Sequence, residues 1–223
     1  MGKVKKGTGV TRHSIDYDNK TISIDLSGNY NGDCFRNDAS IFFFAANSYL
    51  QSYSLISRTL KDCFENKSND RIIERLIMPY FFNFRHYVEL ELKALWITIT
   101  DEYPAKTHDI RKLHSKLNEG MNRITYKSGR GCLLDDFNSS QKILERENKR
   151  LSESIDQFSR MEPASDYYRY LFKKKKKKYM LLENALLFVD YNATDTLFHT
   201  ITNQFRIICS SLTEMGVYVY NII

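Results

Sequence analysis

A stripe of apolar residues near the carboxyl end of the chain is the feature that most constrains its fold. The members of the stripe are Leu197, Ile201, Phe205, Ile208, Leu212, Met215 and Val219. Successive members are three or four residues apart, and an α-helix turns by about 100° per residue, so all of them share one helix face. A helix with one apolar face must bury that face against other elements. The segment therefore predicts one member of a helical bundle.

Two long helices are predicted in the first half of the chain. The first spans residues 37–65 and the second spans about 70–101, and each begins with Asn or Asp residues that can cap it. Pro79 lies inside the second helix. Because proline removes one backbone donor and clashes with the preceding turn, we expect it to kink or divide this helix.

Turn residues and capping residues predict the shape of the middle of the chain. Thr107 is a suitable cap for a helix over residues 108–118, and Gly120 is a suitable stop. Residues 125–138 have few periodic signals and predict a loop. Ser139 or Ser140 then begins a further helix that ends before Pro163, and the apolar segment 179–189 predicts a buried helix.

Length and composition favour a single helical core. The chain has 223 residues, of which only 9 are glycine and 3 are proline, so it has room for one good-sized core but little room for two. Residues 13–27 alternate polar and apolar side chains, which indicates a short hairpin. We therefore predict an all-α, antiparallel helical bundle over residues 37–223, preceded by an N-terminal arm and β-hairpin over residues 1–36.

The net charge of +6 comes from one run of lysines: Lys173, Lys174, Lys175, Lys176, Lys177 and Lys178. Without this run, basic and acidic residues are equal at 27 each, so a single patch would attract a polyanion. Such a run is most often solvated, but it can also bind nucleic-acid phosphates without sequence preference. Tyr168 offers a stacking face and Arg169 a more specific contact, although aromatic anchoring to the core explains the tyrosine equally well.

Several further signals exclude classes of protein. The four cysteines lie far apart and match no zinc-binding or redox motif, which favours free thiols in a reducing cytoplasm. The amino terminus lacks an apolar run, and the uncharged segment 39–57 contains enough polar residues to favour a buried helix over a membrane span. No phosphate-binding loop or metal-binding motif is evident. We expect a cytoplasmic protein without a metal or cofactor.

Four ionisable residues share one flank of the second predicted helix. Arg85, Glu89, Lys93 and His86 fall within about 100° of one another, beside the apolar face. The simplest interpretation is a ladder of i,i+4 ion pairs, each contributing a few tenths of a kcal/mol. A ladder does not need His86, so a functional interpretation is also open. In it, His86 transfers protons, the two cations bind phosphate and Glu89 holds the cations in place.

A second polar pair, His108 and Asp109, follows one helix length later. Asp109 at a helix start would favour the helix dipole, and His108 can be an ordinary loop residue. If the chain instead folds back antiparallel, His108 would come close to His86. The candidate catalytic set is therefore Arg85, His86, Glu89, Lys93, His108 and Asp109.

Short motifs in a particular order suggest a family. They are Phe84-Arg85-His86 with Glu89, Leu92 and Lys93, then His108-Asp109-Ile110 with Leu113, then Ile155-Asp156-Gln157-Phe158, Glu162-Pro163, Ser165 and Tyr168-Arg169-Tyr170. Over about residues 70–172, the chain resembles uncharacterised bacterial proteins with HEPN-like helical bundles. HEPN domains belong to toxin–antitoxin, abortive-infection and antiphage systems. Many are dimeric, metal-independent ribonucleases with an Arg and a His four to six residues apart on one helix, whereas Arg85 and His86 are adjacent here.

The resemblance implies a prokaryotic defence or toxin–antitoxin protein that binds and cleaves RNA. In this reading, His86 or His108 would deprotonate the ribose 2′-hydroxyl, while Arg85 and Lys93 stabilise the phosphorane and Glu89 orients them. A homodimer, and an antitoxin or defence-system protein as partner, are also implied. The alternative is a non-catalytic HEPN-like interaction or dimerisation module whose charged strip is structural. A third interpretation is a nucleic-acid-binding accessory that uses the lysine run.

Overall fold

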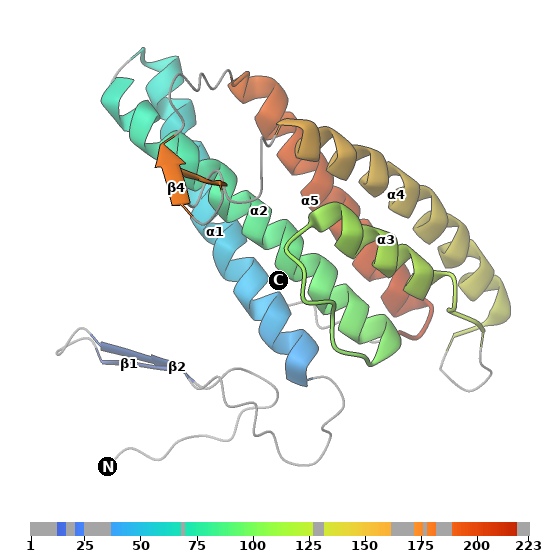
Figure 1. The fold of residues 1–223 in the computed structure, drawn as a ribbon. Helices are drawn as coiled ribbons and strands as arrows, with labels where there is room; N and C mark the ends of the chain where they lie inside the picture. Colours follow the sequence, from blue (N-terminus) through green and yellow to red (C-terminus); the bar gives the residue numbers. More distant parts are fainter. Residues whose placement is uncertain are drawn as a thin grey trace.

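The computed structural model describes residues 13–16, 21–24, 37–67, 70–126, 132–161, 172–175, 178–181 and 189–217. Helices dominate these segments (Figure 1). They are α1 (Asn37–Glu65), α2 (Asp70–Thr100), α3 (Ile110–Met121), α4 (Leu134–Met161) and α5 (Tyr191–Glu214). The prediction of a helical bundle is confirmed. Within the described ranges, no helix combines the length and the apolar character needed to cross a membrane.

Four short strands accompany the helices in the described segments. They are β1 (His13–Asp16), β2 (Thr21–Ile24), β3 (Phe172–Lys175) and β4 (Lys178–Leu181). β1 pairs antiparallel with β2, and β3 pairs antiparallel with β4. The predicted N-terminal unit over residues 1–36, and with it a division of the chain between residues 36 and 37, remains a prediction. Residues 179–181 belong to β4, so the helix predicted over 179–189 is wrong at its start. Residues 182–188 of that prediction lie outside the described part of the chain.

The helices are arranged as two antiparallel pairs with a shorter helix against them. A short link joins α1 to α2, so that these helices lie side by side along most of their length (Figure 1). α4 and α5 form the second pair, and α3 packs against both α2 and α4. This arrangement gives each apolar helix face a partner, as a helical bundle requires.

Aromatic side chains join the two helical pairs at one end of the core. Phe198 of α5 stacks on Phe84 of α2, with ring centroids 3.8 Å apart and ring planes 6° apart. Two further rings contact Phe198 edge-on. The ring centroid of Phe158 of α4 lies 5.1 Å from that of Phe198, and the centroid of Tyr53 of α1 lies 5.7 Å from it. All four side chains are buried, and burying each one contributes about 1.5–3 kcal/mol. One aromatic cluster therefore connects α1, α2, α4 and α5.

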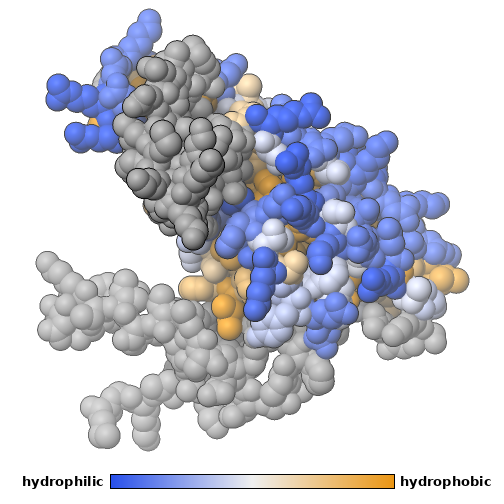
Figure 2. Space-filling model, viewed as in Figure 1, coloured by the Kyte–Doolittle hydropathy of each residue, from blue (hydrophilic) through white to orange (hydrophobic). Residues whose placement is uncertain are grey.

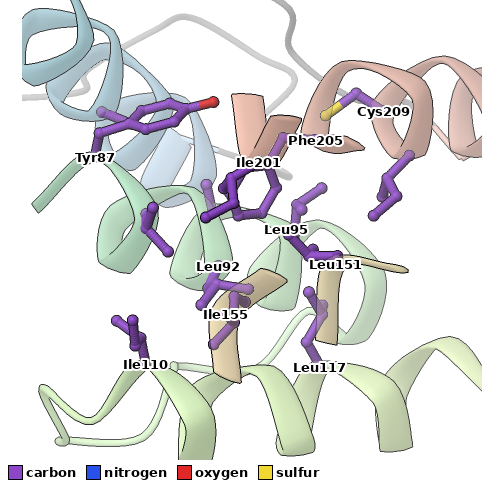
Figure 3. Close-up of a cluster of buried hydrophobic side chains, with 14 of the residues drawn as sticks. Tyr87, Leu92, Leu95, Ile110, Leu117, Leu151, Ile155, Ile201, Phe205 and Cys209 are labelled. Carbon is purple, nitrogen blue, oxygen red and sulfur yellow. The ribbon is translucent and has the colours of Figure 1, made fainter. Parts of the chain in front are cut away.

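A second apolar layer surrounds α2 farther along its length. Figure 3 shows side chains from four helices meeting there: Tyr87, Leu92 and Leu95 of α2, Ile110 and Leu117 of α3, Leu151 and Ile155 of α4, and Ile201, Phe205 and Cys209 of α5. These residues lie on the apolar stripes of the sequence. The short helix α3 therefore belongs to the same core as the long helices.

Asp195 of α5 is a polar anchor beside the aromatic cluster. Its Oδ1 atom accepts hydrogen bonds from Tyr53 and Ser57 of α1 at 2.8 Å and from Tyr80 of α2 at 3.0 Å. Burial and the nearby Asp195 charge raise the pKa of Tyr53 and of Tyr80, so both hydroxyls keep their protons and donate. This carboxylate therefore ties three helices together.

The ends of the helices confirm some predictions and correct others. α1 follows the predicted pattern, whereas α5 ends at Glu214, one residue before Met215 of the predicted stripe, and Val219 lies outside the described residues. α2 runs unbroken through Pro79, so the helix is not divided there, and the alternative of a kink stays a prediction. α4 begins at Leu134, before the predicted start at Ser139 or Ser140. Asp135 and Asp136 lie in its first turn, where negative charge favours the helix dipole.

The predicted limits of α3 are wrong at both ends. Asp109, and not Thr107, is the N-cap, because its carboxylate accepts from the backbone N–H groups of Arg111 at 3.1 Å and Lys112 at 3.3 Å. Gly120 lies inside the helix. A Cβ atom at this position would lie 3.1 Å from Thr100 Cγ2. Gly120 therefore allows α3 to approach α2 closely.

Glu91 is a carboxyl group buried in the core. Its side chain faces Cys209, whose Sγ lies 3.8 Å from Glu91 Oε1. Burial raises the pKa of Glu91 to about 8, so the group is mostly protonated at neutral pH. In the unfolded chain the same carboxyl group ionises with a pKa near 4.5. The folded state therefore binds this proton more tightly than the unfolded state.

We predict that Glu91 makes folding stability decrease with rising pH. Its contribution is fully present below about pH 4.5 and is lost as the pH rises to about 8, at up to about 1.4 kcal/mol per pH unit. Glu91→Gln should lose this slope, so that the variant gains stability relative to the wild type as the pH rises. Urea unfolding at several pH values between 5 and 8.5 measures the difference, with exposed Glu153→Gln as the control. A difference that is constant with pH would contradict the prediction.

Candidate functional site

A buried carboxylate organises the charged flank of α2. Glu89 is only 3% exposed. Its Oε1 atom accepts hydrogen bonds from Lys93 Nζ and from His108 Nδ1, both at 2.8 Å. Its Oε2 atom lies 3.4 Å from Arg85 Nη1. We call Arg85, Glu89, Lys93 and His108 the Glu89 cluster.

Glu89 has three partners in the cluster. Helical spacing brings two of them to it, and the third comes from a loop. Arg85 and Lys93 lie one turn before and one turn after Glu89, where i,i+4 side chains meet. His108 belongs to the connection between α2 and α3. Its approach to Glu89 shows that this connection returns along α2.

Arg85 holds this connection in place. Its side chain is buried, and its Nη2 atom donates a hydrogen bond to the backbone carbonyl of His108. The guanidinium thus contacts both the Glu89 carboxylate and the main chain next to the α3 cap. These contacts give Arg85 a positioning role inside the protein, and its burial does not suit the predicted role as a phosphate ligand at the surface.

The charge of Glu89 depends on its hydrogen-bond donors. Burial alone would raise its pKa, but hydrogen bonds and charge from Lys93 and His108 outweigh this effect and lower the pKa below its ordinary value. Glu89 is therefore ionised at neutral pH. A buried anion of this kind is stable only while its donors remain.

His108 combines a fixed ring with an exposed edge. Its side chain is 61% exposed, while Nδ1 lies on the buried carboxylate. An ionised carboxylate only accepts hydrogen bonds, so Nδ1 carries a proton. In the neutral imidazole, Nε2 is then the acceptor nitrogen. A carboxylate that fixes the tautomer and stabilises the imidazolium is a recurring arrangement for acid–base catalysis.

His86 and Asp109 do not join this arrangement as predicted. His86 Nδ1 lies 3.0 Å from the Phe82 carbonyl, and its ring lies 5.1 Å from the Tyr49 ring of α1. The fold-back therefore brings His108 to Glu89 and leaves His86 on the side of α2 that faces α1. Asp109 uses its carboxylate to cap α3.

The predicted nucleic-acid-binding residues lie in a different part of the chain. Tyr168, Arg169, Lys176 and Lys177 fall outside the described residues. The other four lysines belong to strands, with Lys173, Lys174 and Lys175 in β3 and Lys178 in β4. Among the described residues, no group of His, Cys, Asp and Glu side chains could hold a metal ion.

Sequence reasoning missed a buried polar group between α3 and α4. His114 is 6% exposed and lies 2.9 Å from Asn148 Oδ1. The sequence did contain a signal for this pair, because each of the two polar residues stands among the apolar residues of its helix. His114 lies between Leu113 and Leu117, and Asn148 lies between Leu144 and Leu151.

Comparisons with known proteins provide no relative for this chain: no family model, no curated protein and no solved structure matches it. The chemistry of the site must therefore be inferred from its own geometry.

We predict that Glu89→Gln lowers the free energy of unfolding at pH 7 by about 3 kcal/mol, because buried cations lose their counter-charge. The lowered pKa of Glu89 means that this stabilisation is present above about pH 4.5 and is lost as the pH falls through the folded-state pKa. The difference between wild type and variant should therefore shrink in acid. Urea unfolding at pH 7 and at pH 3.5 measures both effects.

The matched control for this prediction is Glu65→Gln, which breaks an exposed i,i+4 pair with Lys61 at 3.8 Å. We expect a change below about 0.5 kcal/mol for the control. Equal changes in the two variants would show that the burial of the Glu89 cluster contributes nothing.

Proposed function

We propose that the Glu89 cluster is the acid–base centre of a metal-independent endoribonuclease of the HEPN-like type, acting in a prokaryotic defence or toxin–antitoxin system. The observation that supports this proposal is the 2.8 Å contact between Glu89 Oε1 and His108 Nδ1, combined with an imidazole that is largely exposed. Such a pair offers a general base at the surface without a metal ion.

The proposed reaction uses the free nitrogen of His108. Nε2 accepts the proton of a ribose 2′-hydroxyl while the 2′-oxygen attacks the adjacent phosphorus. The bond from phosphorus to the 5′-oxygen breaks, and the departing oxygen takes a proton from solvent. The products are a 2′,3′-cyclic phosphate and a 5′-hydroxyl end. Glu89 remains ionised and stabilises the imidazolium that forms at His108.

Lys93 of the Glu89 cluster and Lys112, four residues after His108 in the chain, suit a phosphate substrate. Lys93 bonds to Glu89 while its side chain remains 12% exposed. Lys112, in the first turn of α3, is 74% exposed and lies 3.9 Å from Asp109. We assign phosphate contact to these two lysines and positioning of His108 to Arg85. A cytoplasmic homodimer that binds RNA, with an antitoxin or defence-system protein as partner, belongs to the same proposal.

One observation favours the alternative, a non-catalytic HEPN-like interaction or dimerisation module. Arg85 and Glu89 are each 3% exposed, and their contacts fasten the α2–α3 connection to α2. A purely structural network would need these contacts and nothing more. The two functions require different things of His108. A ribonuclease needs its exposed acceptor nitrogen as the general base, whereas a structural module does not.

We predict that His108→Ala lowers the rate of RNA cleavage by at least about 100-fold, the typical contribution of a general base. The variant should still fold, because Lys93 continues to donate to Glu89, but the loss of one donor to this buried carboxylate should lower the melting temperature. Cleavage of labelled RNA in the presence of EDTA measures activity. His199→Ala is the control, since His199 is also exposed and lies 3.4 Å from the carboxylate of Asp195. Equal activity of wild type and His108→Ala, or no cleavage by either, would favour the structural module.

RNA binding through the lysine run is tested separately. Replacing Lys173 to Lys178 with glutamine should weaken RNA binding and reduce its dependence on salt, because fewer counterions are released. Affinity measured from low to moderate salt gives both quantities. The control replaces the exposed Lys61 and Lys142, and should retain the salt dependence. If replacing Lys173 to Lys178 leaves the salt dependence of RNA binding unchanged, the lysine run is not the RNA contact.

A further inference from the structure

A cavity of about 650 Å³ lies between α3 and α4. This volume is within the usual range for small-molecule sites. Figure 2 shows that hydrophilic side chains cover most of this face of the molecule. Charged side chains of both signs line the cavity, namely Arg111 of α3 and Glu145, Lys149 and Asp156 of α4. The cations and the anions of the lining are therefore equal in number.

The directions of the two helices decide which of these charges share one end of the cavity. The chain turns back after α3, and the ring centroid of Tyr126 lies 5.5 Å from that of Phe137 in the first turn of α4. The end of α3 is therefore next to the start of α4, so the two helices run antiparallel. Arg111, at the start of α3, then lies at the same end of the cavity as Asp156, in the last two turns of α4.

The charged side chains of the cavity differ from their neighbours in their pairing. Elsewhere on α4, Arg150 contacts the buried carboxylate of Glu147 at 3.0 Å. Arg111, Lys149 and Asp156 line the cavity and form no ion pair with any residue of the described segments. A ligand with charge of one sign would be attracted by one of these groups and repelled by the other at the shared end. A ligand with both charges on neighbouring atoms would pair with both groups.

A fixed chain of hydrogen bonds forms one wall of the cavity. His114 Nε2 lies 2.9 Å from Asn148 Oδ1, and Asn148 Nδ2 donates to Asn118 Oδ1 at 2.8 Å. Burial lowers the pKa of His114, and the Asp156 charge only partly opposes this effect, so the neutral ring donates through Nε2. The order of donors and acceptors fixes each amide. This wall is in place before a ligand binds, so binding does not have to order it.

Apolar side chains supply another part of the lining. Ile155, which precedes Asp156 in α4, contributes to the cavity and is buried. Leu144, Met121 and Met215 are buried as well and line the cavity farther from Asp156 in α4 or on other segments. A ligand whose charged end meets Asp156 can therefore place an apolar group on Ile155, where water is displaced from apolar surface.

We propose that the cavity between α3 and α4 binds a free α-amino acid with an apolar side chain. An α-amino acid carries an ammonium and a carboxylate on one carbon atom, so it presents both charges to one end of the cavity. The carboxylate contacts Arg111, with Lys149 as a second cation. The ammonium donates to Asp156, and the side chain packs on Ile155. The proposal goes beyond the ribonuclease function and does not rest on it.

The test is calorimetric titration of the full chain at neutral pH with L-leucine, L-isoleucine, L-methionine and L-phenylalanine. We expect saturable binding at one site for at least one of them. Two analogues of the tightest ligand, each without one of the charges, separate the two contacts. For leucine these are 4-methylpentanoate, which lacks the ammonium, and 3-methylbutylamine, which lacks the carboxylate. Each analogue should bind at least about tenfold more weakly, because one charged group of the cavity then has no partner.

Charge variants of the cavity assign each contact to a residue. Asp156→Asn should weaken binding of the amino acid at least about fivefold, but should not weaken binding of the analogue that lacks the ammonium. Arg111→Gln should weaken binding of both. The two residues are exposed, so both variants should fold. The control variants Lys116→Ala and Glu119→Ala change exposed residues of α3 outside the cavity and should bind the amino acid about as tightly as the wild type.

Hydrogen exchange of the wild-type protein locates the site without a variant, and the bound amino acid should protect α3 and α4. Three results would overturn the proposal. The first is no saturable binding of any of the four amino acids at millimolar concentration. The second is an analogue with a single charge that binds as tightly as the amino acid. The third is binding that neither Arg111→Gln nor Asp156→Asn weakens.

Discussion

The stacked contact between Phe84 and Phe198 connects the two halves of the bundle. α1 with α2 and α4 with α5 form separate antiparallel pairs, and neither pair could cover all of its apolar surface alone. At a centroid distance of 3.8 Å, the two rings join α2 to α5, and Phe158 extends the contact to α4. With one side of α2 fixed in this way, Glu89 is directed towards the connection to α3. The geometry of the candidate site therefore follows from the aromatic core.

Two carboxyl groups only two residues apart on α2, and therefore on different sides of the helix, show how their surroundings decide their charge. Glu89 and Glu91 are both buried, yet the pKa is lowered for Glu89 and raised to about 8 for Glu91. Glu89 receives hydrogen bonds from Lys93 and His108, whereas Glu91 faces the weak thiol donor of Cys209. Burial favours the neutral form in both cases, and only strong donors reverse it. The ionised carboxylate can thus orient an imidazole, while the protonated one behaves as part of the core.

The sequence was sufficient for the long helices because their apolar stripes repeat over many turns. It also identified Arg85, Glu89, Lys93 and His108, since i,i+4 spacing and a single fold-back bring these residues together. It misplaced His86 because an angle on a helical wheel does not reveal which neighbouring helix covers that angle, and α1 brings Tyr49 to this position. The limits of α3 were missed for a similar reason. The sequence does not show whether Thr107 or Asp109 caps α3. It also does not show whether Gly120 ends the helix or lets it pack closely, because that depends on the neighbouring helix.

Contacts with α2 at both of its ends hold α3 in place. At one end, Arg85 bonds to the His108 carbonyl just before the α3 cap. At the other end, Gly120 brings α3 close to Thr100. On its other side α3 packs against α4, where its polar residues His114 and Asn118 contact Asn148. The same helix therefore follows the connection that carries His108 and lines, together with α4, a polar cavity of about 650 Å³, so that a shift of α3 would change both places.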